Sequence, residues 1–132
     1  MREIKFRAWS SGRKEMTEVE NINFKGNAVY LISKYLRLVA NLDETELMQY
    51  TGLQDENGVD IYEGDIINLS YEYFDGHFRD NEIVGKVCFE GSSFRISYKK
   101  YDEIREWRID EPEILSIEVI GNIYENPELL EV

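Results

Sequence analysis

The chain contains few of the residues that usually form covalent cross-links or carry out catalysis. Its 132 residues include one cysteine, one histidine and two prolines. Because a disulfide needs two cysteines, Cys88 cannot form one within the chain, and nothing requires an oxidising compartment. The N-terminus alternates charged and apolar residues, which predicts neither a signal peptide nor a membrane span. We therefore expect a cytoplasmic protein.

Positive charge is also scarce. Fifteen lysines and arginines stand against 27 acidic residues, which gives a net charge of -12. A field of this sign repels phosphate backbones and anionic membranes, so nucleic acid and membrane are the less expected partners. The hydrophobic fraction of 42% is enough for a core without metals or disulfides, and the length suits one domain over residues 1–132.

Apolar and polar residues alternate with a period of two through much of the chain, which predicts β-strands. Residues 4–24 predict an extended N-terminal hairpin with a turn at 11–14 and a bulge or break after Met16. Residues 28–50 match helical spacing and strand composition equally, so both interpretations stay open. Residues 101–109 fit either a short helix or an edge strand. Asn126 and Pro127 predict one closing helical turn.

Turn signals divide the second half of the chain into short segments. Asn57-Gly58 predicts a type I′ hairpin turn, which requires positive φ at both residues. Residues 74–81 read as a polar loop, and residues 83–98 as a hairpin. The segment from Gly64 to Ile67, with the hairpin at Gly85, resembles the opening of Src-homology-three-type barrels. The expected fold is mainly β: a single small barrel or roll of that type with short helical segments. Periodicity alone does not separate a barrel from a sandwich.

Three stretches together resemble the YopX-like proteins of phages and prophages: Arg2–Trp9, Leu47–Ile66 and Ile117–Leu130. The most specific strings are Ile-Tyr-Glu-Gly-Asp-Ile at residues 61–66 and Val-Ile-Gly-Asn-Ile-Tyr-Glu-Asn-Pro at residues 119–127. The resemblance implies a phage or prophage origin, a β-rich barrel-like core and residence in the bacterial host cytoplasm. It brings no catalytic residues with it. Residues 25–46 and 71–81 contain no motif of that family.

No pattern in the sequence predicts catalytic, cofactor-binding or metal-binding residues. Cys88 and His77 could form a nucleophilic pair, but Cys88 between Val87 and Phe89 is typical of a buried strand position. Asp55, Asn57 and Asp60 lack the glycine position and the distant glutamate of a calcium loop. Among 27 acids, chance carboxylate pairs are expected. The pairs considered draw on Glu63, Asp65, Glu118 and Glu125.

Aromatic residues are abundant, with nine tyrosines, six phenylalanines and two tryptophans. They can shield a small core from water, or they can contact a partner, since tyrosine is favoured at interfaces. The candidate contact residues are Tyr71, Tyr73, Phe74 and Phe78.

These observations favour a non-enzymatic accessory protein that acts through protein contacts or self-association, without a cofactor. The first alternative is an acidic mimic of DNA that inhibits a host nucleic-acid enzyme, since carboxylates can stand in for phosphates. The second is a nucleic-acid-binding barrel with a local basic patch. That patch would comprise Arg79, Arg95, Lys99, Lys100, Arg105 and Arg108.

Overall fold

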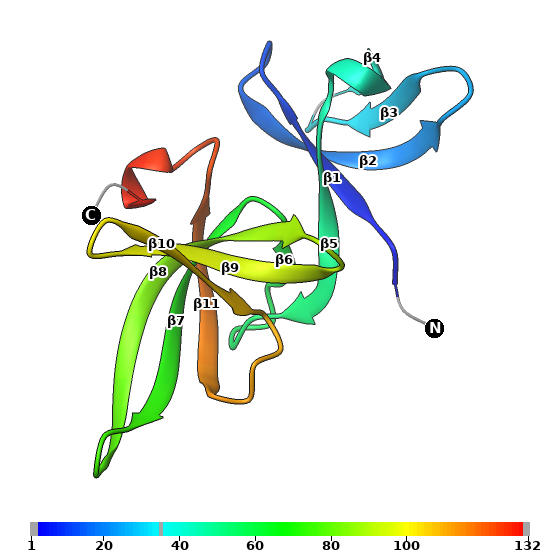
Figure 1. The fold of residues 1–132 in the computed structure, drawn as a ribbon. Helices are drawn as coiled ribbons and strands as arrows, with labels where there is room; N and C mark the ends of the chain where they lie inside the picture. The colour runs from blue at the N-terminus through cyan, green and yellow to red at the C-terminus, as the bar shows by residue number, and fades with distance from the viewer. Residues whose placement is uncertain (1–2, 35, 131–132) are drawn as a thin grey trace. The chain divides into compact units, whose positions relative to one another are not determined.

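The fold is built almost entirely from antiparallel strands (Figure 1). The computed structural model describes residues 3–34 and 36–130. The chain divides into two compact units, residues 1–50 and 51–132, so the expectation of one domain stays a prediction. The strands are β1 (Phe6–Ser10), β2 (Glu15–Asn23), β3 (Ala28–Ile32), β4 (Arg37–Asn41), β5 (Glu46–Gln54), β6 (Asp60–Tyr62), β7 (Asp65–Phe74), β8 (Phe78–Glu90), β9 (Ser93–Lys100), β10 (Glu103–Arg108) and β11 (Ile114–Asn122). Two short 3-10 helices are η1 (Leu42–Glu44) and η2 (Pro127–Leu130).

The first unit is a meander in the order β4-β3-β2-β1, with the first half of β5 beside β1. Its core consists of Ala8, Val29 and Leu31. The predicted N-terminal hairpin is confirmed as β1 and β2, with the turn at residues 11–14. The expected bulge is also present, because the β2–β3 register shifts between Val19 and Asn21.

Residues 28–50, which left helix and strand open, are mainly strand. Val29 and Leu31 are buried, whereas Tyr30 between them is exposed. That period-two burial fits the pleat of β3 and not a helix. Among the residues of this segment that the structure describes, 28–34 and 36–50, only the single 3-10 turn of η1 is helical.

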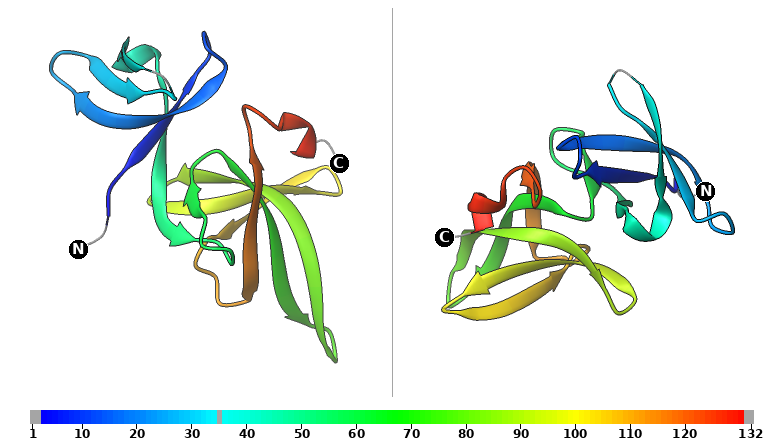
Figure 2. Two further views of the ribbon diagram at one scale, coloured as in Figure 1. Left: turned by 180° about the vertical axis from the view of Figure 1, so that it is seen from behind. Right: turned by 90° about the horizontal axis from the view of Figure 1, so that it is seen from above.

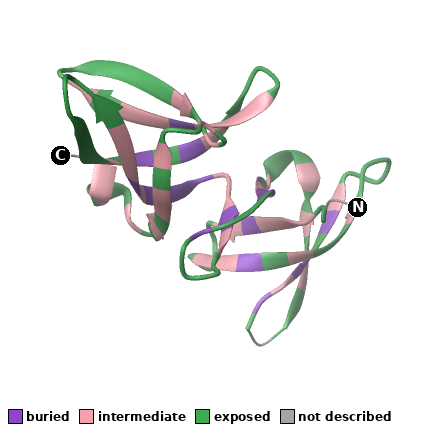
Figure 3. Ribbon diagram, turned by 90° about the horizontal axis from the view of Figure 1, so that it is seen from below, coloured by how far each residue is buried: buried purple, intermediate pink, exposed green. Residues whose placement is uncertain are grey.

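The second unit contains a five-stranded sheet in the order β10-β9-β8-β7-β11, and β11 lies along β7 in the views of Figure 2. The first three residues of β7 are all buried, whereas buried Gly85 and Val87 alternate with exposed Val84 and Lys86 along β8 (Figure 3). The core consists of Ile61, Ile67, Leu69, Val87 and Ile96.

The expected closed barrel is wrong. The sheet ends at β10 on one side and β11 on the other, and these two strands do not pair. The outer edge of β11 is covered by the turn that follows β5, since Ile117 O accepts the N–H of Glu56 at 3.0 Å. The β10 edge is a short, charged strand, which is one way in which open sheets avoid further pairing. In the described part of the chain, the expected helical segments are limited to the 3-10 turns η1 and η2. Residues 103–108, left open between helix and strand, form the edge strand β10.

The predicted polar loop at residues 74–81 is also corrected. Strand β7 runs to Phe74 and β8 begins at Phe78, so only residues 75–77 make the turn. Gly76 has a φ of 103° there. The resulting hairpin extends well beyond the end of β11 (Figure 1). Its strand formers Tyr73, Phe74 and Phe78 continue the ladder.

The side chain of Asp55 connects two of the three stretches that carry the family resemblance, Leu47–Ile66 and Ile117–Leu130. Its Oδ1 accepts the N–H groups of Asn57 at 2.8 Å and Val59 at 2.9 Å, and its Oδ2 accepts the N–H of Val119 at 2.9 Å. The side chain is buried, with 8% exposed. The turn that follows β5 is thereby fixed to β11, 64 residues later.

The same turn differs from the predicted type I′. Only Gly58 has positive φ, at 79°, and Asn57 does not. The N–H of Gly58 donates to Asp55 O at 3.0 Å, and the N–H of Asp55 donates to Val59 O at 2.8 Å. This is the pattern of a longer loop with a left-handed glycine at its end. The carboxylate of Asp55 selects that loop because it needs the N–H of Asn57 turned inward.

A second connection lies at Gly64, in the turn between β6 and β7. Its N–H donates to Val87 O at 2.8 Å, and its carbonyl accepts the N–H of Ile123 at 2.9 Å. Its φ of 83° favours glycine. Gly121 is required for a different reason, since an added Cβ would lie 2.5 Å from Asn126 Oδ1.

Within the described residues, no helix has the length and apolar character needed to cross a membrane.

We expect Asp55→Asn to lower the free energy of unfolding of the second unit by about 2–3 kcal/mol, because an amide offers one acceptor oxygen to three N–H donors and places an NH₂ against at least one of them. Urea unfolding would measure this loss. Asp80→Asn, at an exposed position of β8, is the matched control and should change stability by less than about 0.5 kcal/mol. Equal losses in both variants would contradict the role of Asp55.

Lowering the pH should remove the stabilisation that the ionised Asp55 provides. Burial by itself raises the pKa of Asp55, but the N–H groups of Val119, Val59 and Asn57 outweigh it and hold the pKa below its ordinary value. The stabilisation is therefore complete above the unfolded pKa of about 3.9 and is lost as pH falls towards the folded pKa. The stability difference between wild type and Asp55→Asn should shrink over that window in urea titrations. A difference that stays constant from pH 7 to pH 3 would refute this linkage.

Candidate functional site

The most distinctive surface feature is a pocket beside the projecting part of the β7–β8 hairpin. It forms where β11 ends, because the last β7–β11 register pair is Tyr71 with Ile114. Glu72 still donates its N–H to Glu113 O, but beyond Glu72 only β8 pairs with β7, so side chains from both faces of β7 reach the pocket. Its volume is about 620 Å³, within the range of ligand pockets. The lining residues are Tyr71, Glu72, Tyr73, Phe74, Phe78, Glu106, Trp107, Glu111 and Glu113.

All four aromatic residues singled out from the sequence line this pocket. Tyr71 lies 6.0 Å from Tyr73 and 4.8 Å from Trp107 between ring centroids, and Phe74 lies 5.2 Å from Phe78. Phe74 and Phe78 are 67% and 75% exposed. The structure therefore brings the four candidate residues together on one wall of the pocket, although the segment was expected to be a loop, and their role as partner contacts stays a prediction.

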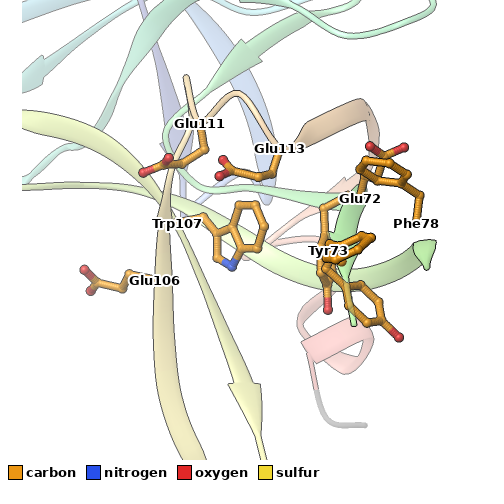
Figure 4. Close-up of a pocket in the computed structure, with 9 residues that line it drawn as sticks. Glu72, Tyr73, Phe78, Glu106, Trp107, Glu111 and Glu113 are labelled. Carbon is orange, nitrogen blue, oxygen red and sulfur yellow. The ribbon is translucent and has the colours of Figure 1, made fainter. Parts of the chain in front are cut away.

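Trp107 forms the opposite wall and was missed as a candidate. It comes from β10, where it faces Ile96 across the sheet. The indole Nε1–H donates to Tyr98 Oη at 2.9 Å, which fixes the ring. Figure 4 shows the indole pointing from β10 towards the hairpin that carries Tyr73 and Phe78. Its signal in the sequence was hidden because residues 101–109 fitted helix and strand equally.

The remaining lining residues are four glutamates. Glu72 and Glu113 are neighbours, since the N–H of Glu72 donates to Glu113 O at 2.9 Å. Glu106 turns to the other side of β10 in Figure 4, where Arg95 Nη1 lies 3.9 Å from its carboxylate. A hydrogen bond with Glu90, together with desolvation and repulsion, raises the pKa of Glu106, and Arg95 offsets part of this. The pocket therefore combines aromatic walls with carboxylates and has no lining lysine or arginine.

A second hollow of about 530 Å³ lies over β8, β9 and β10 and is closed on one side by η2. Its lining includes Ile83, Val84, Lys86, Lys99 and Leu130. It has two lysines, and none of the residues singled out from the sequence as partner contacts line it. We therefore regard the aromatic pocket as the candidate site.

The nucleophilic pair is not formed. His77 is at the tip of the β7–β8 hairpin and Cys88 is near the far end of β8, about 30 Å away along an extended strand. Burial raises the pKa of Cys88, Glu90 and Glu106 add to the rise, and Lys86 and Arg95 oppose it. The thiol therefore stays protonated at neutral pH, as expected for a half-buried strand cysteine.

Three of the carboxylates considered for metal binding or hydrolysis have structural partners. Asp55 accepts three backbone N–H groups, Asp65 Oδ2 accepts the N–H of Tyr62 at 2.8 Å, and Glu125 Oε1 accepts Asn122 Nδ2–H at 3.2 Å. Glu118 is exposed on β11, opposite Asn68. In the described part of the chain, no three histidine, cysteine or acidic side chains are grouped to hold a metal ion.

The candidate basic patch is divided and neutralised. Arg79 is on β8, whereas the other five residues are on the β9–β10 hairpin. Each of the four arginines has a carboxylate partner. The pairs are Arg79–Asp75 at 2.9 Å, Arg95–Glu106 at 3.9 Å, Arg105–Glu103 at 3.4 Å and Arg108–Asp110 at 3.2 Å.

Comparison with known proteins identifies the family. The profile described as YopX protein matches residues 5–131. The chain belongs to the YopX family. Its fold is similar to the crystal structure of protein EF1440 from Enterococcus faecalis, with a TM-score of 0.58, 25% identity and coverage of 98% of this chain and 99% of that chain. No curated protein sequence matches the chain.

The YopX motifs of this chain are structural. Four motif residues stabilise turns or contacts between distant segments: Asp55, Gly58, Gly64 and Gly121. None of them lines the aromatic pocket. The pocket residues from the hairpin come instead from a segment without a recognised family motif. The motif residues named here therefore support the fold and lie outside the pocket.

We expect Tyr98→Phe to loosen the pocket wall, because it removes the acceptor of the Trp107 N–H. The half-buried N–H would lose its partner, at a cost of about 1 kcal/mol of stability, and the fluorescence of Trp107 would change. Urea unfolding and emission spectra in a Trp9→Phe background would measure both. Tyr101→Phe is the control, since Tyr101 is 87% exposed. Indistinguishable spectra for the two variants would show that Tyr98 does not position the indole.

Proposed function

We propose that this YopX protein is a non-enzymatic accessory protein of a phage or prophage that acts by contacting another protein through the aromatic pocket. The observation that carries the proposal is the exposure of Phe74 and Phe78 at a concave site. Large aromatic side chains in a pocket are typical anchors of protein interfaces. The partner is a host or phage protein, or a second copy of this chain.

The arrangement is suited to binding for a physical reason. The aromatic groups are carried by a two-stranded hairpin whose ladder is continuous from Ile66–Lys86 to Phe74–Phe78. Its base is fixed by β11 and β9 on either side. Because the rings are attached to paired strands, less conformational freedom is lost when a partner orders them than for rings on a mobile loop.

The acidic mimic of DNA is a weaker candidate. It uses the net charge of -12, but such a mimic needs its carboxylates on one surface. The exposed acids are divided between the units, with Glu18 and Glu20 on β2 and Glu106 and Glu113 around the pocket. The pocket walls are also aromatic, which phosphate mimicry does not require.

The test compares a double variant of the pocket with a single variant of an exposed phenylalanine in the other unit. Phe74→Ser with Phe78→Ser should abolish copurification of the partner from host cells, or self-association measured by light scattering. The control is Phe24→Ser, which removes a ring that is 76% exposed in the other unit and should keep the partner. Both variants alter exposed residues, so stability should change little. Retention of the same partners by both proteins would contradict the proposal.

A further inference from the structure

We infer that the aromatic pocket binds the guanidinium group of an arginine on a basic segment of the partner. This inference rests on the proposed function and specifies the chemistry of the partner. It depends on three features: unpaired carboxylates, fixed aromatic faces and the absence of a cation among the lining residues.

Three of the pocket carboxylates are without counter-charge. Glu72, Glu111 and Glu113 make no ion pair and no side-chain hydrogen bond within residues 3–34 and 36–130. Glu106, by contrast, is near Arg95. Neighbouring arginines are already paired, as Arg79 is with Asp75 and Arg108 is with Asp110. Low-dielectric walls concentrate the field of unneutralised charges, so the pocket attracts a cation.

The aromatic walls present their faces in a fixed arrangement. The Trp107 N–H is already bonded to Tyr98 Oη, and Tyr71 Oη accepts Asn81 Nδ2–H at 3.1 Å. The rings of Tyr71 and Trp107 are tilted by 54° at 4.8 Å. What remains for a ligand is the π-face of each ring, which attracts cations, most strongly for tryptophan.

Arginine fits these groups better than lysine. A guanidinium is planar, so it can stack on an aromatic face while its edge donates two parallel hydrogen bonds to a carboxylate. Lysine offers a compact, strongly hydrated charge that stacks poorly. The volume of about 620 Å³ also leaves room for residues flanking the arginine, which would contact the exposed pair Phe74 and Phe78.

The probe is the capped peptide acetyl-Gly-Arg-Phe-Arg-Gly-amide, titrated into the full chain by calorimetry. We expect it to bind at least about tenfold more tightly than the lysine peptide, and the citrulline peptide to show no binding, because citrulline keeps the shape of arginine but has no charge. Equal binding of the citrulline peptide would overturn the inference. So would no binding of the arginine peptide at millimolar concentration.

Two double variants distinguish binding of the arginine peptide at the pocket from its attraction by the net charge of the protein. Glu72→Gln with Glu113→Gln should weaken the arginine peptide about tenfold or more, since it removes two of the unpaired carboxylates. Glu18→Gln with Glu118→Gln changes the net charge of the protein by the same amount, but at positions outside the pocket. This control should leave the affinity for the arginine peptide within about twofold. Equal weakening by both pairs would mean attraction to the overall charge and would overturn the inference.

The two proposals fail independently. If the arginine peptide does not bind but Phe74→Ser with Phe78→Ser still abolishes copurification, the protein contact stands and the arginine chemistry is wrong. If the peptide binds and the phenylalanine variant keeps its partner, the pocket recognises arginine but the proposed contact through the hairpin is wrong.

Discussion

The second unit depends on one buried carboxylate that satisfies three backbone donors. Asp55 lies at the end of β5, and its two oxygens bind the following turn and β11 together. Without it, the N–H of Val119 and the N–H groups of the turn would lose their acceptor in a largely water-excluded place. Because the partners are 64 residues apart, this contact connects parts of the chain that no local preference could bring together.

The open sheet and the pocket follow from that connection. The turn after β5 covers the outer edge of β11, so β11 needs no further strand partner and the sheet remains open. Since β11 begins only at Ile114, the β7–β8 hairpin continues past it, and the free edge of β7 gives access to both faces. The pocket forms in the space between this edge and Trp107 of β10. The contact of Asp55 with Val119 therefore also leaves room for a pocket whose lining residues take no part in that contact.

Sequence reasoning succeeded where the structure is local. The β1–β2 hairpin was predicted from alternation, and so was a bulge or break in the second extended stretch, which the structure places between Val19 and Asn21. Sequence reasoning failed at Asn57, where the contact of Asp55 with a distant backbone group determined the turn type. It also failed at residues 74–81, where polar residues suggested a loop and the structure has a hairpin. In the hairpin, cross-strand pairs such as Tyr73–Arg79 and Phe74–Phe78 offset the low strand preference of glycine, aspartate and asparagine.

The sequence by itself determined the β class, the family and the aromatic half of the candidate site, because pleated alternation and motif strings are properties of neighbouring residues. Only the tertiary structure decided that the sheet stays open and that Trp107 and the three unpaired glutamates line one pocket with the aromatic residues of the hairpin. These outcomes depend on which strand ends meet across the sheet, and that is determined by hydrogen bonds between distant residues such as Asp55 and Val119.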